Sequence, residues 1–281
     1  MSHRPEAGIA PADGASLAGT LGDTQGGMPG GIPGGMPGVL VHFTGAQLDG
    51  LPDANLAHHR PHVPEHLAAA RAQVGERTRT HPGAWHLMRQ VHGADVAVVD
   101  EDVPVGAELR DVDVMVTTLP DRPLVVLTAD CLPIVAAGPR AVGVAHAGWR
   151  GIVAGAPEAL IAAMVGLGER AEDLRVVIGP AIGPCCYAVG PEVVEAVGGR
   201  VGSAVTTTRD GAPSVDLRLA AHTAMRRGGV LSTTDLEVGQ GASGGPGLCT
   251  ACGTGWFSHR RDPNAGRQAA LVVRRGGVVD G

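Results

Sequence analysis

Three short motifs in the chain each contain one residue that can bind a metal ion. They are Q-V-H-G with His92, A-D-C-L-P with Cys131 and H-A-G-W-R-G with His146. Each residue lies at or near the end of an apolar, strand-like run, and strand ends can bring distant residues to one edge of a sheet. Two imidazoles and one thiolate suit zinc, and three protein ligands leave a fourth position for water or substrate. The pattern predicts a catalytic zinc site made by His92, Cys131 and His146.

The same three residues also allow a function without metal. If either histidine lies beside Cys131, the imidazole lowers the pKa of the thiol, and the thiolate can attack an acyl group. Both hypotheses need the same residues to converge, so their spacing does not separate a zinc site from a Cys–His nucleophile.

Charged residues flank these motifs. Asp130 precedes Cys131, and we expect it to act as a general acid or base or to hold a ligand histidine. Arg150 lies in a glycine-containing strand-to-helix turn, where backbone amides favour an anion. Arg260, in F-S-H-R-R-D, is expected to clamp a phosphate or carboxylate, although a solvated loop with an Arg–Asp pair would leave the same pattern.

The other four cysteines form two short groups. Cys249 and Cys252 make a C-x-x-C that is an incomplete zinc site without a second half, and the adjacent Cys185 and Cys186 are expected to be structural because neighbouring side chains seldom chelate one ion. The odd count of five cysteines and an N-terminus without an apolar signal argue against a disulfide framework. The sequence therefore predicts a cytoplasmic protein.

Composition excludes several classes of function. All 22 basic residues are arginine, which excludes a Schiff-base lysine, and with it ordinary pyridoxal phosphate chemistry, as well as a Walker A loop. The net charge of -6 and the absence of any basic run longer than two arginines argue against nucleic-acid binding. No stretch approaches the roughly 20 apolar residues of a membrane span.

The elements that must position these residues follow from hydrophobic patterning. Short apolar runs separated by Pro, Gly or Asp predict strands, and helical spacing predicts helices. The predicted strands cover residues 85–91, 95–99, 112–117, 124–128, 134–137, 141–145, 174–178, 236–238 and 269–273. The predicted helices cover residues 65–74, 152–167, 192–197 and 217–227, the last with Asp216 as its N-cap.

Mixed strands and helices of this kind indicate an α/β (α+β) fold with one mixed-sheet domain over residues 39–281. Residues 1–38 are expected to be a disordered tail, because their repeated Gly-Met-Pro-Gly and Gly-Ile-Pro-Gly units bury too little apolar surface to offset the ordering entropy.

Taken together, the motifs resemble a known family. They include Q-V-H-G-A-D, T-A-D-C-L-P-I, A-H-A-G-W-R-G, I-G-P-A-I-G-P-C-C-Y-A-V-G, C-T-A-C and F-S-H-R-R-D. The chain is similar to the laccase-domain or multicopper polyphenol oxidoreductase family, which is also described as a zinc-dependent purine nucleoside phosphorylase family and as peptidoglycan editing factor. The matching motifs run from about residue 85 to the C-terminus.

The resemblance implies an α/β/α-type arrangement and a zinc ion held by His92, Cys131 and His146. It implies phosphorolysis of adenosine, inosine and 5′-methylthioadenosine, together with adenosine deaminase activity, so the partners would be purine nucleosides and phosphate. Substrate-binding roles are expected for Asn55, Arg71, Gln90 and Arg260, and catalytic roles for Asp130 and Arg150. The alternatives are a Cys–His amidohydrolase editing peptidoglycan precursors and a protein that binds ligand without turnover.

The older family name implies copper and phenol oxidation. We expect copper less than zinc, because one His-His-Cys site and five cysteines cannot build the several copper centres that reduce oxygen by four electrons. The chain also departs from the family at residues 42–47, which read H-F-T-G-A-Q and lack the arginine and the glycine pair that members usually carry there.

Overall fold

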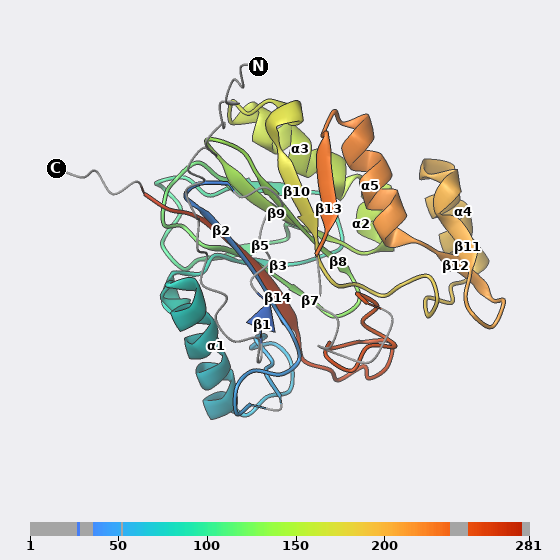
Figure 1. Ribbon diagram of the computed structural model, residues 1–281, viewed down its shortest axis with the longest axis horizontal. Helices are drawn as coiled ribbons and strands as arrows, with labels where there is room; N and C mark the ends of the chain where they lie inside the picture. Colours follow the sequence, from blue (N-terminus) through green and yellow to red (C-terminus); the bar gives the residue numbers. More distant parts are fainter. Residues whose placement is uncertain (1–26, 29–35, 52, 237–246, 277–281) are drawn as a thin grey trace, which may run out of the picture.

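The computed structural model describes residues 27–28, 36–51, 53–236 and 247–276. Two sheets contain most of the strands (Figure 1). The six-stranded sheet has the order β13-β10-β8-β9-β6-β4, and the four-stranded sheet has the order β1-β2-β14-β7. The strands of these sheets are β1 (Gly27–Met28), β2 (Val39–Thr44), β4 (Val96–Val98), β6 (Val114–Thr117), β7 (Leu124–Thr128), β8 (Leu132–Ala137), β9 (Val142–Ala147), β10 (Arg175–Ile178), β13 (Ser232–Asp235) and β14 (Gln268–Arg274).

The remaining elements are two small strand pairs and the helices. β3 (Leu87–Arg89) pairs with β5 (Glu108–Arg110) in parallel, and β11 (Val205–Thr207) pairs with β12 (Pro213–Val215) in antiparallel. The helices are α1 (Pro64–Thr78), α2 (Trp149–Ala154), α3 (Ala156–Gly166), α4 (Pro191–Arg200) and α5 (Leu217–Arg227), with single 3₁₀ turns at Pro82–Ala84, Ala171–Asp173 and Gly202–Ala204.

Strand alternation explains why the two sheets stack. In β7, Leu124 and Val126 belong to the core between the sheets, whereas Val125 and Leu127 belong to the core under α1. Because successive side chains of a strand point to opposite faces, a strand that is apolar at every position must be covered on both faces. All five residues of β7 are buried, so this strand lies inside the domain and not at its surface.

Helices close the two outer faces of the stack (Figure 1). α1 covers the four-stranded sheet with Ala70 and Val74, while α3 and α5 cover the six-stranded sheet with side chains such as Leu160 and Leu217. The structure therefore confirms the predicted mixed α/β domain, and its central β layer consists of two sheets packed face to face.

One predicted helix is two helices. Residues 152–167 were expected to be continuous, but α2 ends at Ala154 and α3 begins at Ala156. The residue between them, Gly155, has φ of 92°. That left-handed conformation ends a right-handed helix and is accessible to glycine at little cost. The chain turns there. One continuous stretch of apolar spacing therefore forms two helices, α2 and α3, that run in different directions.

Most other predicted elements agree with the structure. β7 and α5 have the predicted bounds, and the Asp216 side chain caps α5 by accepting a hydrogen bond from the Leu219 amide. The strand predicted at residues 85–91 is confined to Leu87–Arg89, and the strand predicted at 236–238 falls partly outside the described residues; β13 ends just before it. β1 lies within the predicted tail, most of which is also outside the described residues.

The two sheets are joined directly by residues 129–131, which run from the end of β7 in one sheet to the start of β8 in the other. The link is short, and Asp130 makes its turn with φ of 87°. It places Asp130 and Cys131 at an edge that both sheets share. β9 neighbours β8 in the six-stranded sheet, so His146 lies at the same edge, opposite Pro133.

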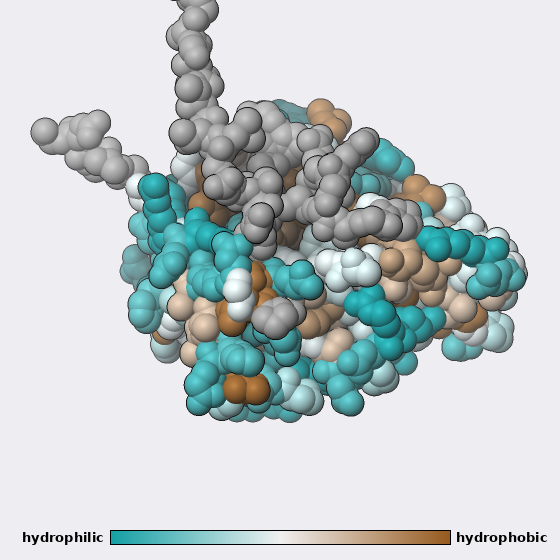
Figure 2. Space-filling view, turned by 60° about the horizontal axis from the view of Figure 1, so that its bottom comes forward, coloured by the Kyte–Doolittle hydropathy of each residue, from teal (hydrophilic) through white to brown (hydrophobic). Residues whose placement is uncertain are grey.

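On the face drawn in Figure 2, hydrophobic residues occur in groups separated by hydrophilic ones. None of the helices in the described part of the chain is long and apolar enough to cross a membrane.

Candidate metal centre and cleft

The structure brings the three predicted ligands together. His146 lies near the end of β9, Cys131 lies in the link between the sheets, and His92 lies in the loop that follows β3. Their ligand atoms all lie within 4.8 Å of one another, and the two imidazole rings meet edge to face with centroids 4.8 Å apart. His92 is exposed while His146 is buried, so the group opens to solvent on one side.

A buried carboxylate that the sequence analysis did not identify organises this group. Asp113, just before β6, is fully buried and accepts hydrogen bonds from the backbone amides of Val91, His92 and Gly93 at 3.1, 3.0 and 2.7 Å. It also lies 2.8 Å from Nδ1 of His146. An ionised carboxylate only accepts, so Nδ1 of His146 donates to Asp113, and Nε2 is the ring nitrogen that binds a metal ion once it has lost its proton.

The charges of the group are strongly coupled. Burial opposes ionisation of the Cys131 thiol, but the charge of His146 and hydrogen bonds from His146 and His92 lower the pKa of Cys131 to about 6. Burial likewise disfavours a charged His146, but the Cys131 thiolate and the bond to Asp113 raise the pKa of His146 to about 9. Without a metal ion the pair is therefore a thiolate and an imidazolium at neutral pH.

The close packing of the ligands depends on Gly148. A Cβ atom at this position would lie 2.8 Å from Sγ of Cys131 and 3.2 Å from Cδ2 of His92. Carbon and sulfur do not approach so closely without displacement, so any side chain here would separate the two ligands. The glycine of H-A-G-W-R-G thus has a steric role at the site.

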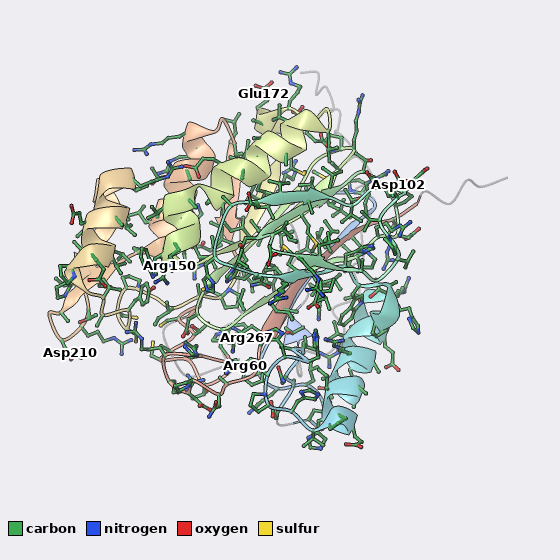
Figure 3. All side chains as sticks on the ribbon, turned by 180° about the vertical axis from the view of Figure 1, so that it is seen from behind. Arg60, Asp102, Arg150, Glu172, Asp210 and Arg267 are labelled. Atoms are coloured by element: carbon green, nitrogen blue, oxygen red, sulfur yellow. The ribbon has the colours of Figure 1, made fainter. Side chains whose placement is uncertain are left out.

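The ligands lie in the wall of a cleft with a volume of about 780 Å³. This volume is within the range of about 300–1,000 Å³ usual for small-molecule sites. Its wall also contains Trp149, Tyr187, Asp130, Gln90 and the arginines Arg89, Arg150, Arg260 and Arg267. In Figure 3, Arg267 and Arg60 are labelled next to each other near the middle of the view, Arg150 lies above and to the left of them, and Glu172 and Asp102 lie at the top and upper right.

Asp130 and Arg260 are connected in this wall. Oδ2 of Asp130 accepts a hydrogen bond of 2.6 Å from the Arg260 amide, and Oδ1 accepts one of 2.5 Å from the Thr250 hydroxyl. Asp113, not Asp130, contacts the ligand histidine. The Arg260 guanidinium donates to the Ala188 carbonyl and lies 5.2 Å above the Tyr187 ring. Arg150 stacks on Trp149 at 4.4 Å.

The other predicted substrate-binding residues, Gln90, Asn55 and Arg71, all form hydrogen bonds with backbone groups. Gln90 lines the cleft, but both ends of its amide pair with the backbone of Leu127. Asn55 is buried and bonds to the backbone of Ala57 and Arg267. Arg71 binds the Leu56 carbonyl. Gln90 is part of the cleft wall, whereas the contacts of Asn55 and Arg71 stabilise the neighbouring loops. The substrate-binding roles of all three residues stay predictions.

Arg267 adds a further positive charge to the cleft wall. Burial and the charge of the nearby Arg60 lower the pKa of Arg267. Burial of His59, together with the charges of His58 and Arg267, lowers the pKa of His59. Neighbouring positive charges therefore contribute to both shifts beside burial, and these charges favour an anion in this part of the cleft.

The donor set fits zinc. Two imidazole nitrogens and a thiolate match the ligand types of catalytic zinc sites, and the Asp113–His146 bond is the kind of outer contact that orients a ligand histidine. The fit rests on this chemistry and on Nε2 of His146, the ring nitrogen that Asp113 does not engage.

The chain is similar to known proteins over most of its length. The chain is 37% identical over 211 residues to "Purine nucleoside phosphorylase ORF3" of Streptomyces griseus, covering 74% of this chain and 82% of that protein. It is 35% identical over 221 residues to "Purine nucleoside phosphorylase Rv2149c" of Mycobacterium tuberculosis, covering 78% and 83%. The fold matches the crystal structure of YlmD from Geobacillus stearothermophilus with a TM-score of 0.76 and 27% identity, covering 90% of this chain and 98% of that one.

A family described as multi-copper polyphenol oxidoreductase laccase matches residues 42–275, a range that includes every ligand and every arginine of the cleft. The sequence resemblance is thereby confirmed, and the chain belongs to this family.

Proposed function

We propose that the chain is a zinc-dependent purine nucleoside phosphorylase. The observation that carries the proposal is the convergence of His92, Cys131 and His146 in the wall of a cleft that arginines also line. The names of the relatives support the reaction class. Adenosine, inosine and 5′-methylthioadenosine are the proposed nucleosides, and phosphate is the second substrate.

Phosphorolysis requires phosphate to attack C1′ of the ribose while the purine leaves, with positive charge developing on the sugar. Arg150 and Arg260 line the cleft, and we expect them to hold phosphate, because a guanidinium group can bind two phosphate oxygens at once. Holding phosphate against C1′ turns a bimolecular reaction into an effectively unimolecular one. Zinc, when bound by the three ligands, supplies Lewis acidity.

Tyr187 is suited to donate a proton rather than to lose one. Burial, followed by the charge of Cys131, raises the pKa of Tyr187 to about 12. At neutral pH its hydroxyl therefore keeps its proton and can donate a hydrogen bond to the leaving purine or to a ribose hydroxyl. Trp149 also lines the cleft, within a chain in which aromatic residues make up only 2%.

Product analysis tests the proposal. Zinc-loaded protein incubated with adenosine and phosphate should release adenine and ribose 1-phosphate, and the release should require phosphate. Cys131→Ala should lower turnover by more than about 100-fold, because it removes a ligand. Inosine formed with or without phosphate would reveal the adenosine deaminase activity that we also propose. Full phosphorolysis by metal-free Cys131→Ala would contradict the mechanism.

A second candidate is favoured by the closeness of Cys131 and His146, whose sulfur and ring nitrogen lie within 4.8 Å of each other, together with the lowered pKa of the Cys131 thiol. Such a pair is the nucleophile of Cys–His hydrolases, and an amidohydrolase acting on peptidoglycan precursors would use it. Iodoacetamide distinguishes the two. A zinc-bound Cys131 should resist alkylation until a chelator is added, whereas a nucleophilic Cys131 should react, and lose activity, with chelator or without it.

The family name's copper chemistry fits the site less well. Four-electron reduction of oxygen uses several copper centres, and one group of two histidines and one cysteine provides a single site. The five free thiols fit a reducing compartment such as the cytoplasm, which we propose as the location.

A further inference from the structure

A second group of metal-binding side chains lies outside the His92–Cys131–His146 centre. Its members are Cys185, Cys186, Cys249 and Cys252, and all four sulfur atoms lie within 4.8 Å of one another. From the sequence, the C-x-x-C of Cys249 and Cys252 lacks a second half. The structure places the adjacent pair Cys185–Cys186 against it, although more than 60 residues separate them in the chain.

The spacing of the sulfurs matches a tetrahedral thiolate site. Zinc–sulfur bonds of about 2.3 Å in a tetrahedron place neighbouring sulfurs about 3.8 Å apart. Here Sγ of Cys185 lies 3.7 Å from Sγ of Cys186 and 3.9 Å from Sγ of Cys252. All four cysteines are free, and disulfide-bonded sulfurs would lie about 2.0 Å apart. The group is therefore close to the geometry that one ion requires.

The surroundings of Cys249 and Cys252 also suit thiolates. The Gly183 amide donates a hydrogen bond of 3.2 Å to Sγ of Cys249, and the Arg209 guanidinium donates one of 3.3 Å to Sγ of Cys252. Donors aimed at sulfur stabilise negative charge there. Arg261 binds the carbonyls of Thr250, Ala251 and Gly253, which fixes the turn that presents Cys249 and Cys252.

We propose that Cys185, Cys186, Cys249 and Cys252 bind a structural zinc ion, distinct from the centre in the cleft. Four sulfur ligands fill a tetrahedral coordination sphere, so this site leaves no position for substrate. Soft, tetrahedral all-sulfur sites select zinc or iron–sulfur chemistry over copper(II) or magnesium. The proposal does not depend on the phosphorolysis reaction.

The site would fasten together the two loops that form one wall of the cleft. The loop between β10 and α4 (residues 179–190) carries Ile182 and Tyr187, and the loop at residues 247–267 carries His259 and Arg260. The loops already meet through hydrogen bonds between Ala181 and the backbone of Leu248 and Thr250. A metal crosslink beside this contact would hold Tyr187 and Arg260 at a fixed separation.

Metal content of the purified protein, measured by mass spectrometry with protein quantified by amino-acid analysis, tests the site. Wild-type protein should contain about two zinc ions per chain. The double variant Cys185→Ser/Cys252→Ser should contain about one, and so should the matched control Cys131→Ser, which removes a ligand of the cleft centre only. A loss of zinc in the control alone would overturn the four-cysteine site while leaving the cleft centre intact.

A second measurement on the wild-type chain covers the case in which the double variant does not fold. Replacing zinc by Co²⁺ gives thiolate-to-metal charge-transfer absorption in proportion to the number of cobalt–sulfur bonds. With both sites filled, Cys131→Ser should lower this absorption by about one fifth, since it removes one of five thiolates. A wild-type spectrum that vanishes in Cys131→Ser would refute the proposal, and so would an intact mass showing that the four thiols form disulfides.

Discussion

At the residue scale, one carboxylate connects the three ligands of the cleft centre. Asp113 holds the backbone of the loop that carries His92 and, at the same time, the ring of His146. His146 in turn lowers the pKa of Cys131. The position of one ligand and the protonation of the other two therefore depend on a residue that contacts no metal ion.

Asp113→Asn tests this dependence. An amide can replace only some of the four accepted hydrogen bonds and can present its NH₂ group to Nδ1, which favours the wrong tautomer of His146. Zinc affinity of the cleft centre should fall by about 10–100-fold, measured by competition with a chromogenic chelator. The matched control is Asp111→Asn, an exposed neighbour, which should bind zinc like the wild type. Equal affinities for the two variants would contradict the role of Asp113.

The pKa values of the pair predict how zinc affinity varies with pH. Between about pH 6 and 9 Cys131 is already ionised while His146 still carries a proton on Nε2, which zinc must displace. The binding constant of the cleft centre should therefore rise about tenfold per pH unit in this window and level off above it. Chelator competition over this range, with the Cys131→Ala signal subtracted, measures the slope. A slope near zero would mean that His146 is neutral in the metal-free protein.

The ligands could be predicted from the sequence because each ends an apolar run, and strand ends meet at an edge. Asp113 could not, because an acidic residue before a strand has no local pattern that separates it from a solvated one. The four-cysteine group was missed for a related reason. Its two halves are brought together by tertiary contacts such as the pairing of Ala181 with the segment at Cys249, which no local pattern predicts.

At the scale of elements, the break between α2 and α3 positions Arg150. α2 begins directly after the strand that carries His146, and its first turn holds Trp149 and Arg150 in the cleft wall. A continuous helix over residues 152–167 would have to follow one direction, whereas Gly155 lets α3 turn onto the six-stranded sheet while α2 stays short.

Gly155→Ala should destabilise the fold. Alanine in the left-handed conformation costs about 1–2 kcal/mol, and its Cβ would lie 2.9 Å from Nη2 of Arg200, which is paired with Glu158. Thermal unfolding should show a lower midpoint than in the wild type. Gly166→Ala is the matched control, because an added Cβ there meets nothing within 4 Å and the residue lies in α3. A midpoint unchanged by Gly155→Ala would show that the turn tolerates a side chain.

Regular elements were predictable where a local signal agreed with the tertiary structure. α5 has a side-chain cap at Asp216, and β7 is apolar throughout, so the bounds of both follow from the sequence. The strand at residues 85–91 was overpredicted because Gln90 has a strand-like neighbourhood but turns its amide to the edge of β7. The helical spacing of apolar residues continues on both sides of Gly155, so the sequence pattern did not predict that α2 and α3 are separate helices.

At the scale of the whole molecule, the cleft is a product of global folding. Its wall draws on Gln90, Asp130, His146, Tyr187 and Arg267, which come from five separate parts of the chain. Residues 129–131 join the two sheets at this edge, so a ligand bound there ties both layers together. Binding at the cleft should consequently stabilise the whole domain and not one loop.

Removal of zinc should therefore lower the midpoint of thermal unfolding. Free zinc at about 100 times the dissociation constant stabilises a protein by about 2.7 kcal/mol for each site, which corresponds to about 5–10 °C per site in a domain of this size. Scanning calorimetry before and after chelation measures the shift, and Mg²⁺, which prefers oxygen ligands, should not restore it. Cys131→Ala should retain a smaller zinc-dependent shift, from the four-cysteine site alone. If Cys131→Ala and wild-type protein respond equally to zinc, the cleft centre does not bind the ion; if neither responds, zinc does not stabilise the fold at either site.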